Sequence, residues 1–89
     1  MRTDEIEPYV RRICKERLQL AMNLHADLRC TDPHLFVDLC MASIDRAEKS
    51  LQEDAGLHDM CKLAYIDLTR LVADEKQRAL TRLEAINMI

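Results

Sequence analysis

Three features of this sequence predict an all-α fold, an antiparallel bundle of three helices in one domain spanning residues 1–89. Helix-breaking residues are rare, with one Gly and two Pro in 89 residues, and 33% of the residues are charged. Only Tyr9, Phe36 and Tyr65 are aromatic, so the core has to be built from aliphatic side chains. Two local breaks divide the chain into three segments of helical periodicity, and such short connections imply antiparallel neighbours.

The first helix is predicted over about residues 5–29. Asp4 and Glu7 have the spacing of a capping box, and Pro8 is tolerated in a first turn. The apolar side chains cover more than half of its circumference: Ile6, Tyr9, Val10, Ile13, Cys14, Leu18, Leu20, Ala21, Leu24 and Leu28. One neighbouring helix cannot cover so wide a surface. Arg17 lies within it, and it either extends its charge to the edge or pairs with an acidic residue across an interface.

The second helix is predicted over about residues 33–54. Thr31 or Asp32 can cap its N-terminus, with Pro33 in the first turn. One side carries an apolar stripe of Phe36, Leu39, Cys40, Ile44, Ala47 and Leu51. Small residues along this stripe should let a neighbouring helix approach closely; they are Ser43, Ala47 and Ser50. Gly56 is predicted to end the helix as its C′ residue.

The third helix is predicted over about residues 58–87. It begins with an apolar stripe of Leu57, Met60, Cys61, Ala64, Leu68, Leu71 and Val72. The segment DEKQR at 74–78 then interrupts the stripe. Ala79, Leu83 and Ile86 resume it at an angle of roughly 60° around the helix. Asp74 and Gln77 could restart the helix as a capping box and kink it, but a continuous helix is the interpretation we favour.

The C-terminal segment is apolar, with Leu80, Leu83, Ile86, Met88 and Ile89 among its last residues. At about 1.5 Å per residue the third helix reaches roughly 45 Å and the second about 33 Å, so the third should overhang the second. We therefore predict that another chain covers this end, in a self-association such as a homodimer. The alternative is that it folds back onto Ile6 and Tyr9. The predicted protein-interface residues are Leu80, Leu83, Ile86, Ile89, Arg17, Val10 and Ile13.

The best candidate metal ligands are Cys30 and His34 together with His58 and Cys61, which are suitable residue types for zinc. The two pairs follow different connections, however, and these lie at opposite ends of a three-helix bundle, about 30 Å apart. We therefore expect no metal and no other cofactor.

No catalytic signature stands out, and we do not expect an enzyme. A single Gly cannot form a Gly-rich phosphate loop. A nucleophilic Cys would need a lowered pKa and a nearby base. Cys14 and Cys40 occupy core positions of their helices, and Cys61 has only His58 one turn away. The four cysteines are expected to be free thiols that serve as small apolar side chains.

A cluster of basic residues on the first helix raises the alternative of a nucleic-acid-associated regulator; it comprises Arg11, Arg12, Lys15 and Arg17. The net charge of the chain is -3, and residues 31–56 carry six acidic and two basic residues. Neither connection offers a separate short recognition helix. A nucleic-acid partner is therefore not expected, and the charges are better explained by complementarity between helices or with a partner protein.

The broad apolar helix faces predict a protein–protein interaction module, a small regulator, assembly factor or chaperone-like adaptor that binds a partner helix or itself. No apolar run approaches the roughly 20 residues of a membrane span. The first ten residues lack the apolar stretch of a signal peptide, so a cytoplasmic location is expected. Two alternatives remain: the nucleic-acid-associated regulator, and a metal or thiol sensor based on Cys and His.

Overall fold

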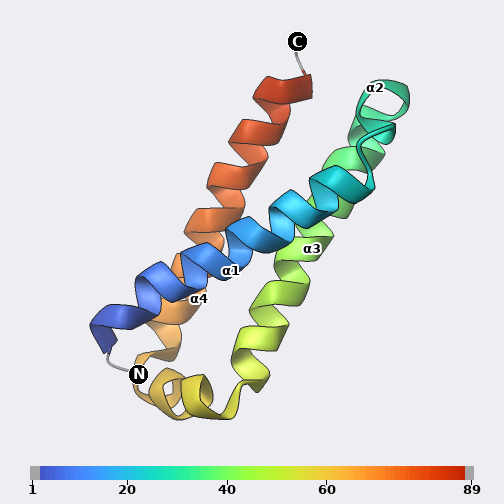
Figure 1. The fold of residues 1–89 in the computed structure, drawn as a ribbon. Coiled ribbons are helices and arrows are strands. Elements are labelled where there is room, and N and C mark those ends of the chain that lie inside the picture. The colour runs from blue at the N-terminus through green and yellow to red at the C-terminus, as the bar shows by residue number, and fades with distance from the viewer. Residues whose placement is uncertain (1–2, 88–89) are drawn as a thin grey trace.

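The computed structural model describes the backbone of residues 3–87 and the side chains of residues 5–54, 56 and 66–86. Four helices make up nearly all of this backbone: α1 (Thr3–Leu24), α2 (Leu28–Thr31), α3 (Pro33–Glu53) and α4 (Ala55–Asn87). Figure 1 shows α1 and α4 running in one direction and α3 running in the opposite direction. No strand occurs in the described backbone, so the predicted all-α bundle is confirmed.

The first helix is shorter than predicted, because α1 ends at Leu24 and not near residue 29. The last bond continuing its helical pattern joins the amide of His25 to the carbonyl of Ala21, at 3.0 Å. A turn over residues 25–27 and the single turn of α2 follow. An acidic residue such as Asp27 is unfavourable near the negative C-terminal end of a helix, and it carries no apolar side chain to bury.

The start of α3 follows the sequence prediction. The Asp32 carboxylate accepts a hydrogen bond from the backbone amide of Leu35 at 3.1 Å, and Pro33 lies in the first turn. This cap satisfies one of the amides that have no partner within a helix.

The end of α3 differs from the prediction. Asp54 is extended, with φ of -67° and ψ of 118°, and α4 begins directly at Ala55. Gly56 therefore lies inside α4, and no residue of the described backbone has a positive φ. The C′ role assigned to Gly56 is wrong, because one extended residue already redirects the chain without a left-handed glycine.

Helix α4 is continuous through residues 74–78, as favoured from the sequence, and it begins earlier than predicted. A straight helix of its 33 residues would be roughly 50 Å long, whereas the longest dimension of the molecule is 43 Å. Figure 1 shows the reason: the first turns of α4 run across the end of the bundle before the rest turns alongside α3. The bend therefore lies near the beginning of the helix.

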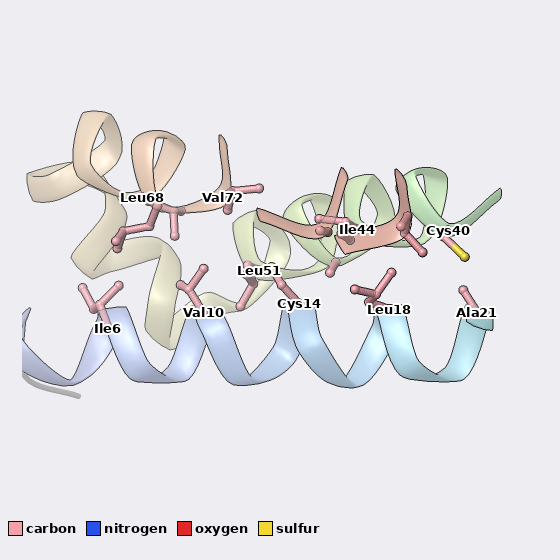
Figure 2. Close-up of a cluster of buried hydrophobic side chains, with 14 of the residues drawn as sticks. Ile6, Val10, Cys14, Leu18, Ala21, Cys40, Ile44, Leu51, Leu68 and Val72 are labelled. Atoms are coloured by element: carbon pink, nitrogen blue, oxygen red, sulfur yellow. The ribbon is translucent and has the colours of Figure 1, made fainter. Parts of the chain in front are cut away.

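One hydrophobic core runs along the inner faces of the three long helices, and Figure 2 shows much of it. Its buried apolar residues are Ile6, Val10, Cys14, Leu18, Ala21, Phe36, Cys40, Ile44, Ala47, Leu51, Leu68, Leu71, Val72, Ala79 and Leu83. On α1 they recur mainly four positions apart, a row typical of helices that cross at a steep angle of about 50°. Figure 1 shows α1 running obliquely across α3 and α4. The stripe predicted for α3 is confirmed except at Leu39, which is half-buried.

The C-terminal part of α4 packs on its own chain. Leu83 is completely buried, in the same core as Leu68 and Val72. Arg29 of α2 also donates a weak hydrogen bond to the carbonyl of Ile86, at 3.4 Å. The expectation that another chain covers Leu83 is therefore corrected. Because the first turns of α4 run across the end of the bundle, the helix ends about level with α2 (Figure 1).

Candidate functional site

A groove of about 340 Å³ lies between the second half of α1 and the first half of α3. Its lining residues are Arg17, Leu20, Ala21, Leu24, His25, Leu39, Ala42, Ser43 and Arg46. Helix α4 packs against both α1 and α3 but contributes no described residue to this lining. The groove is therefore on an open side of the α1–α3 pair, which the third long helix leaves uncovered.

The spacing of residues on α1 explains how the helix presents a wall to this groove. Ile13, Arg17, Leu20 and Leu24 follow the pattern i, i+4, i+7, i+11, so they share one side of the helix. This row lies beside the buried core row. Ile13 is half-buried, whereas Leu20 is 61% exposed and Leu24 is 75% exposed. The two leucines are among the largest exposed apolar side chains of the described residues.

The opposite wall comes from α3, and small residues bring the two helices together at the floor. The hydroxyl of Ser43 donates a hydrogen bond to the backbone carbonyl of Arg17, at 3.0 Å. Ala21 and Ala42 also line the groove and add little bulk. The close approach predicted for Ser43 is confirmed, and it fixes which parts of the two helices stand opposite each other.

Two arginines give the groove a positive charge. Arg17 stands on the α1 wall and Arg46 on the α3 wall. Both are exposed, and among the described residues neither side chain has an ion pair or hydrogen bond. No Asp or Glu is among the described residues that line the groove. An anionic group entering it would therefore meet two cations that no described side chain neutralises.

Other basic residues are neutralised within the bundle. Arg11 of α1 pairs with Glu7 at 3.0 Å and with the buried Glu75 of α4 at 2.9 Å. Burial alone would lower the pKa of Arg11, but the hydrogen bonds to these two carboxylates outweigh it and raise the pKa above its ordinary value. Arg78 reaches Glu75 less closely, at 4.0 Å.

Lys76 makes the corresponding connection from α4 to α3. Its ammonium pairs with Asp45, and with Glu48 at 3.0 Å. The hydrogen bond to Asp45, followed by that to Glu48, raises the pKa of Lys76 despite its partial burial. The DEKQR segment, which the sequence marks only as an interruption of the apolar stripe, therefore joins α4 to both neighbouring helices.

Sequence reasoning missed the burial of Glu75, although a signal for it exists. Glu75 lies seven, four and three residues after Leu68, Leu71 and Val72, and four before Ala79, so it occupies a core position in an unbroken stripe. Because the stripe continues through Glu75 without changing its side of the helix, Ala79 and Leu83 lie in the same core.

The predicted interface residues that the structure describes do not form one surface. Val10 and Leu83 are completely buried within the chain, so they offer no surface to a partner. Leu80, Ile86 and Ile13 are half-buried. Ile89 lies outside the described residues. Arg17 is exposed and lines the groove, where Ile13 shares its side of α1.

The basic cluster predicted on α1 is divided among different surroundings. Arg11 is directed to α4, and Arg17 lines the groove. The guanidinium of Arg12 lies over the ring of Tyr9, 5.4 Å from its centre, in a cation–π arrangement. Lys15 is exposed. These residues therefore do not present one continuous basic face.

The candidate metal ligands are not brought together in the described part of the chain. Cys30 and His34 are exposed at the α2 end, whereas the start of α4 lies at the opposite end of the bundle (Figure 1). The side chains of His58 and Cys61 lie outside the described set. Among the described residues, no group of three or more His, Cys, Asp or Glu side chains could hold a metal ion.

The described thiols of Cys14, Cys30 and Cys40 are free, and Cys14 and Cys40 are buried in the core as predicted. Burial, with a smaller effect from the charge of Glu75, raises the pKa of Cys14 to about 11. Burial also raises the pKa of Cys40. A raised pKa opposes formation of the thiolate, which is the reactive form of cysteine. Both side chains therefore act as apolar core residues.

No described helix is long and apolar enough to cross a membrane. Comparisons with protein-family models, curated proteins and solved structures give no match to this chain. The α1–α3 groove combines two exposed leucines with two arginines that have no ion-pair partner among the described residues.

Proposed function

We propose that this chain is a protein-binding module that holds an amphipathic helix of a partner protein in the α1–α3 groove. The observation that carries the proposal is the exposure of Leu20 and Leu24 in a groove between two packed helices. Covering a leucine side chain stabilises a complex by about 1.5–3 kcal/mol before the costs of association. A groove between two helices suits a third helix, whose apolar side chains can interdigitate with both walls.

The charge of the groove supports an acidic partner. Arg17 and Arg46 have no partner among the described side chains, and the described lining of the groove contains no carboxylate. A helix with acidic residues beside its apolar face would match these two charges, whereas a basic helix would be repelled. In this role the chain would act as a small regulator, assembly factor or chaperone-like adaptor.

A nucleic-acid-associated role has weaker support. Arg11 is neutralised by Glu7 and Glu75, and Arg17 lines an apolar groove. Nucleic-acid binding depends on several cations that face the phosphate backbone together. A small-molecule ligand is also a poorer match, because about 340 Å³ is near the low end for such pockets and two large leucines remain exposed.

Binding of a labelled amphipathic peptide tests the proposal by fluorescence anisotropy. The probe is a helical peptide of about 18 residues with blocked ends, Leu at i, i+4, i+7 and i+11, and Glu in both end turns. We expect the wild type to bind it with a Kd of about 1–100 µM. Leu20→Asp with Leu24→Asp should weaken binding at least about tenfold, because it places charge on the apolar wall.

Ile66→Asp is the matched control. Ile66 is 82% exposed on α4 and does not line the groove, so this variant should bind as the wild type does. Circular dichroism checks that all variants keep their helicity. Failure of the wild type to bind, or equal binding by the double variant, would contradict the proposal. Affinity capture with the same three proteins then identifies a partner as one lost only with the double variant.

A second copy of this chain is the competing occupant, and sedimentation equilibrium separates the two cases. A wild type that dimerises at about 100 µM and becomes monomeric with Leu20→Asp and Leu24→Asp would place a second copy in the groove. A wild type that stays monomeric while it binds the peptide would support the partner helix. The concentration is sufficient because a Kd of about 100 µM corresponds to roughly 5–6 kcal/mol.

A further inference from the structure

We infer that the groove selects the direction of the bound helix, with the acidic C-terminal turn of that helix between Arg17 and Arg46. This inference rests on the proposed function and adds to it which end of the partner carries the charge. It follows from three properties of the groove: the pairing of its two walls, the separation of its apolar and charged residues, and the dipole of a helix.

The contact between Ser43 and the carbonyl of Arg17 fixes the pairing of the two walls. Because α1 and α3 are antiparallel, residues after Arg17 on α1 stand opposite residues before Ser43 on α3. Leu24 therefore lies at the same end of the groove as Leu39. Arg46 lies one turn after Ser43, at the end where Arg17 stands.

The groove consequently has two unlike ends. Leu24 is seven residues from Arg17, and Leu39 is seven residues from Arg46, so two turns or about 10 Å separate the leucine end from the arginine end on both walls. Leu20 lies between them. The leucine end is nearest the connection from α1 to α3, where His25 also lines the groove. The arginine end faces the middle of the molecule.

A helix placed in this groove has unlike ends as well. Its C-terminal turn carries unpaired carbonyl groups and a partial negative charge, and its N-terminal turn carries a partial positive charge. Acidic side chains in the last turn add to the negative end. The favourable arrangement places that turn between the two arginines, so the bound helix runs antiparallel to α1 and parallel to α3. A reversed helix would bring its positive end to the arginines.

This arrangement also sets the spacing of the partner's residues. The apolar anchors that meet Leu24 and Leu39 come first in the partner sequence. Carboxylates follow about seven residues later, two turns nearer the C-terminus. The two groove arginines would then act as specificity-determining residues, and Leu20 and Leu24 as the apolar contacts that any bound helix shares.

Three peptides with the same leucine face and blocked ends test this inference by anisotropy. The first has Glu in the last turn, the second has Glu in the first turn, and the third has Lys in the last turn. The wild type should bind the first about tenfold more tightly than the second, with the third weakest, since two exposed charge pairs change affinity by this order. Glu in the first turn stabilises a helix, whereas Glu in the last turn destabilises it. The second peptide is therefore more helical than the first, so helicity alone cannot make the first peptide bind more tightly.

Arg17→Glu with Arg46→Glu should reverse the preference, so that the Lys peptide binds most tightly. Lys15→Glu with Lys49→Glu is the matched control, because both lysines are exposed and neither lines the groove. That variant makes the same change in net charge and should keep the wild-type order. High salt should reduce the differences among the peptides, because exposed charges are screened.

Failure of this inference is distinguishable from failure of the proposed function. Equal binding of the first two peptides, or tighter binding of the second, would overturn the inferred direction while leaving helix binding in the groove intact. An unchanged order in Arg17→Glu with Arg46→Glu would also overturn it. Absence of binding by all three peptides at about 100 µM would overturn the proposed function and this inference together.

Discussion

The carboxylate of Glu75 on α4 lies 2.9 Å from the guanidinium of Arg11 on α1, and both side chains are largely withdrawn from solvent, with exposures of 4% and 17%. This pair connects two helices within an otherwise apolar core. A buried carboxylate keeps its charge only at a cost unless a cation and hydrogen bonds compensate. Removing one partner should therefore cost much stability, although the intact pair itself adds little net stability to the fold.

Arg11→Met should lower the free energy of unfolding by about 2–3 kcal/mol, because Glu75 loses its closest cation and stays buried. The loss is moderated by Arg78, which remains 4.0 Å away. Arg11→Met with Glu75→Leu should recover most of it, because a buried ion pair can be replaced by apolar side chains. Arg12→Met is the control, with a change below about 1 kcal/mol. Urea unfolding of the wild type and the three variants measures these changes. No recovery in the double variant would contradict this account.

The buried thiol of Cys14 predicts a loss of stability in alkali. Burial raises its pKa from an ordinary 9.0 to about 11. Between these values the unfolded chain releases a proton that the folded chain keeps. Stability from this group is therefore complete below about pH 9 and should fall by roughly 2–3 kcal/mol as the pH rises to about 11. Urea unfolding at a series of pH values measures this decline.

Two variants isolate the contribution of Cys14. Cys14→Ala should be less stable at neutral pH because of the cavity, but its alkaline decline should be shallower than that of the wild type. Cys30→Ala should follow the wild type, because Cys30 is exposed. The raised pKa of Lys76 also makes stability fall as the pH rises, and this contribution is the same in every protein of the series. Parallel declines in Cys14→Ala and wild type would refute the assignment.

The cap of α3 should be measurable on its own. Asp32→Ala removes the acceptor for the amide of Leu35 and should cost about 1 kcal/mol of stability. Asp38→Ala removes the same group from an exposed position within α3, where no cap exists, and should change stability by less than about 0.5 kcal/mol. Equal losses in thermal unfolding would mean that net charge, and not the cap, is responsible.

Two leucines distinguish core from groove. Leu83→Ala should destabilise the chain by about 2–4 kcal/mol, because Leu83 is completely buried. Leu24→Ala makes the same chemical change at a residue that is 75% exposed, and should change stability by less than about 0.5 kcal/mol. If sedimentation equilibrium instead showed that Leu83→Ala dissociates an oligomer at unchanged monomer stability, the packing of α4 described above would be wrong.

The elements predicted well from the sequence are those that local chemistry determines. Asp32 followed by Pro33 specifies a helix start regardless of what surrounds it, and Phe36, Cys40 and Ile44 share one face of any helix that contains them. The small side chain of Ser43 was correctly linked to a close approach. These inferences needed only helical geometry and the properties of single residues.

The features that were missed depend on how the helices are arranged. The first turns of α4 run across the end of the bundle (Figure 1), and this shortens the reach of the helix and brings Leu83 into the core. The sequence marks Glu75 only as part of the DEKQR interruption, because its partner, Arg11, is 64 residues away in the chain. The groove could not be located either, because it depends on which side of the α1–α3 pair α4 occupies. Arg17 was identified as unusual, but its surroundings required the fold.

The most direct test of helix binding in the groove is a nuclear magnetic resonance titration of labelled wild-type protein with the peptide that carries Glu in both end turns. Binding should shift the signals of Leu20, Leu24, Leu39 and Ala42 first and most strongly, and saturate in the concentration range found by anisotropy. Shifts centred instead on α4 around Ile66 would contradict helix binding in the groove. An absence of shifts at about 100 µM peptide would contradict it as well, because this concentration detects a complex of roughly 5–6 kcal/mol.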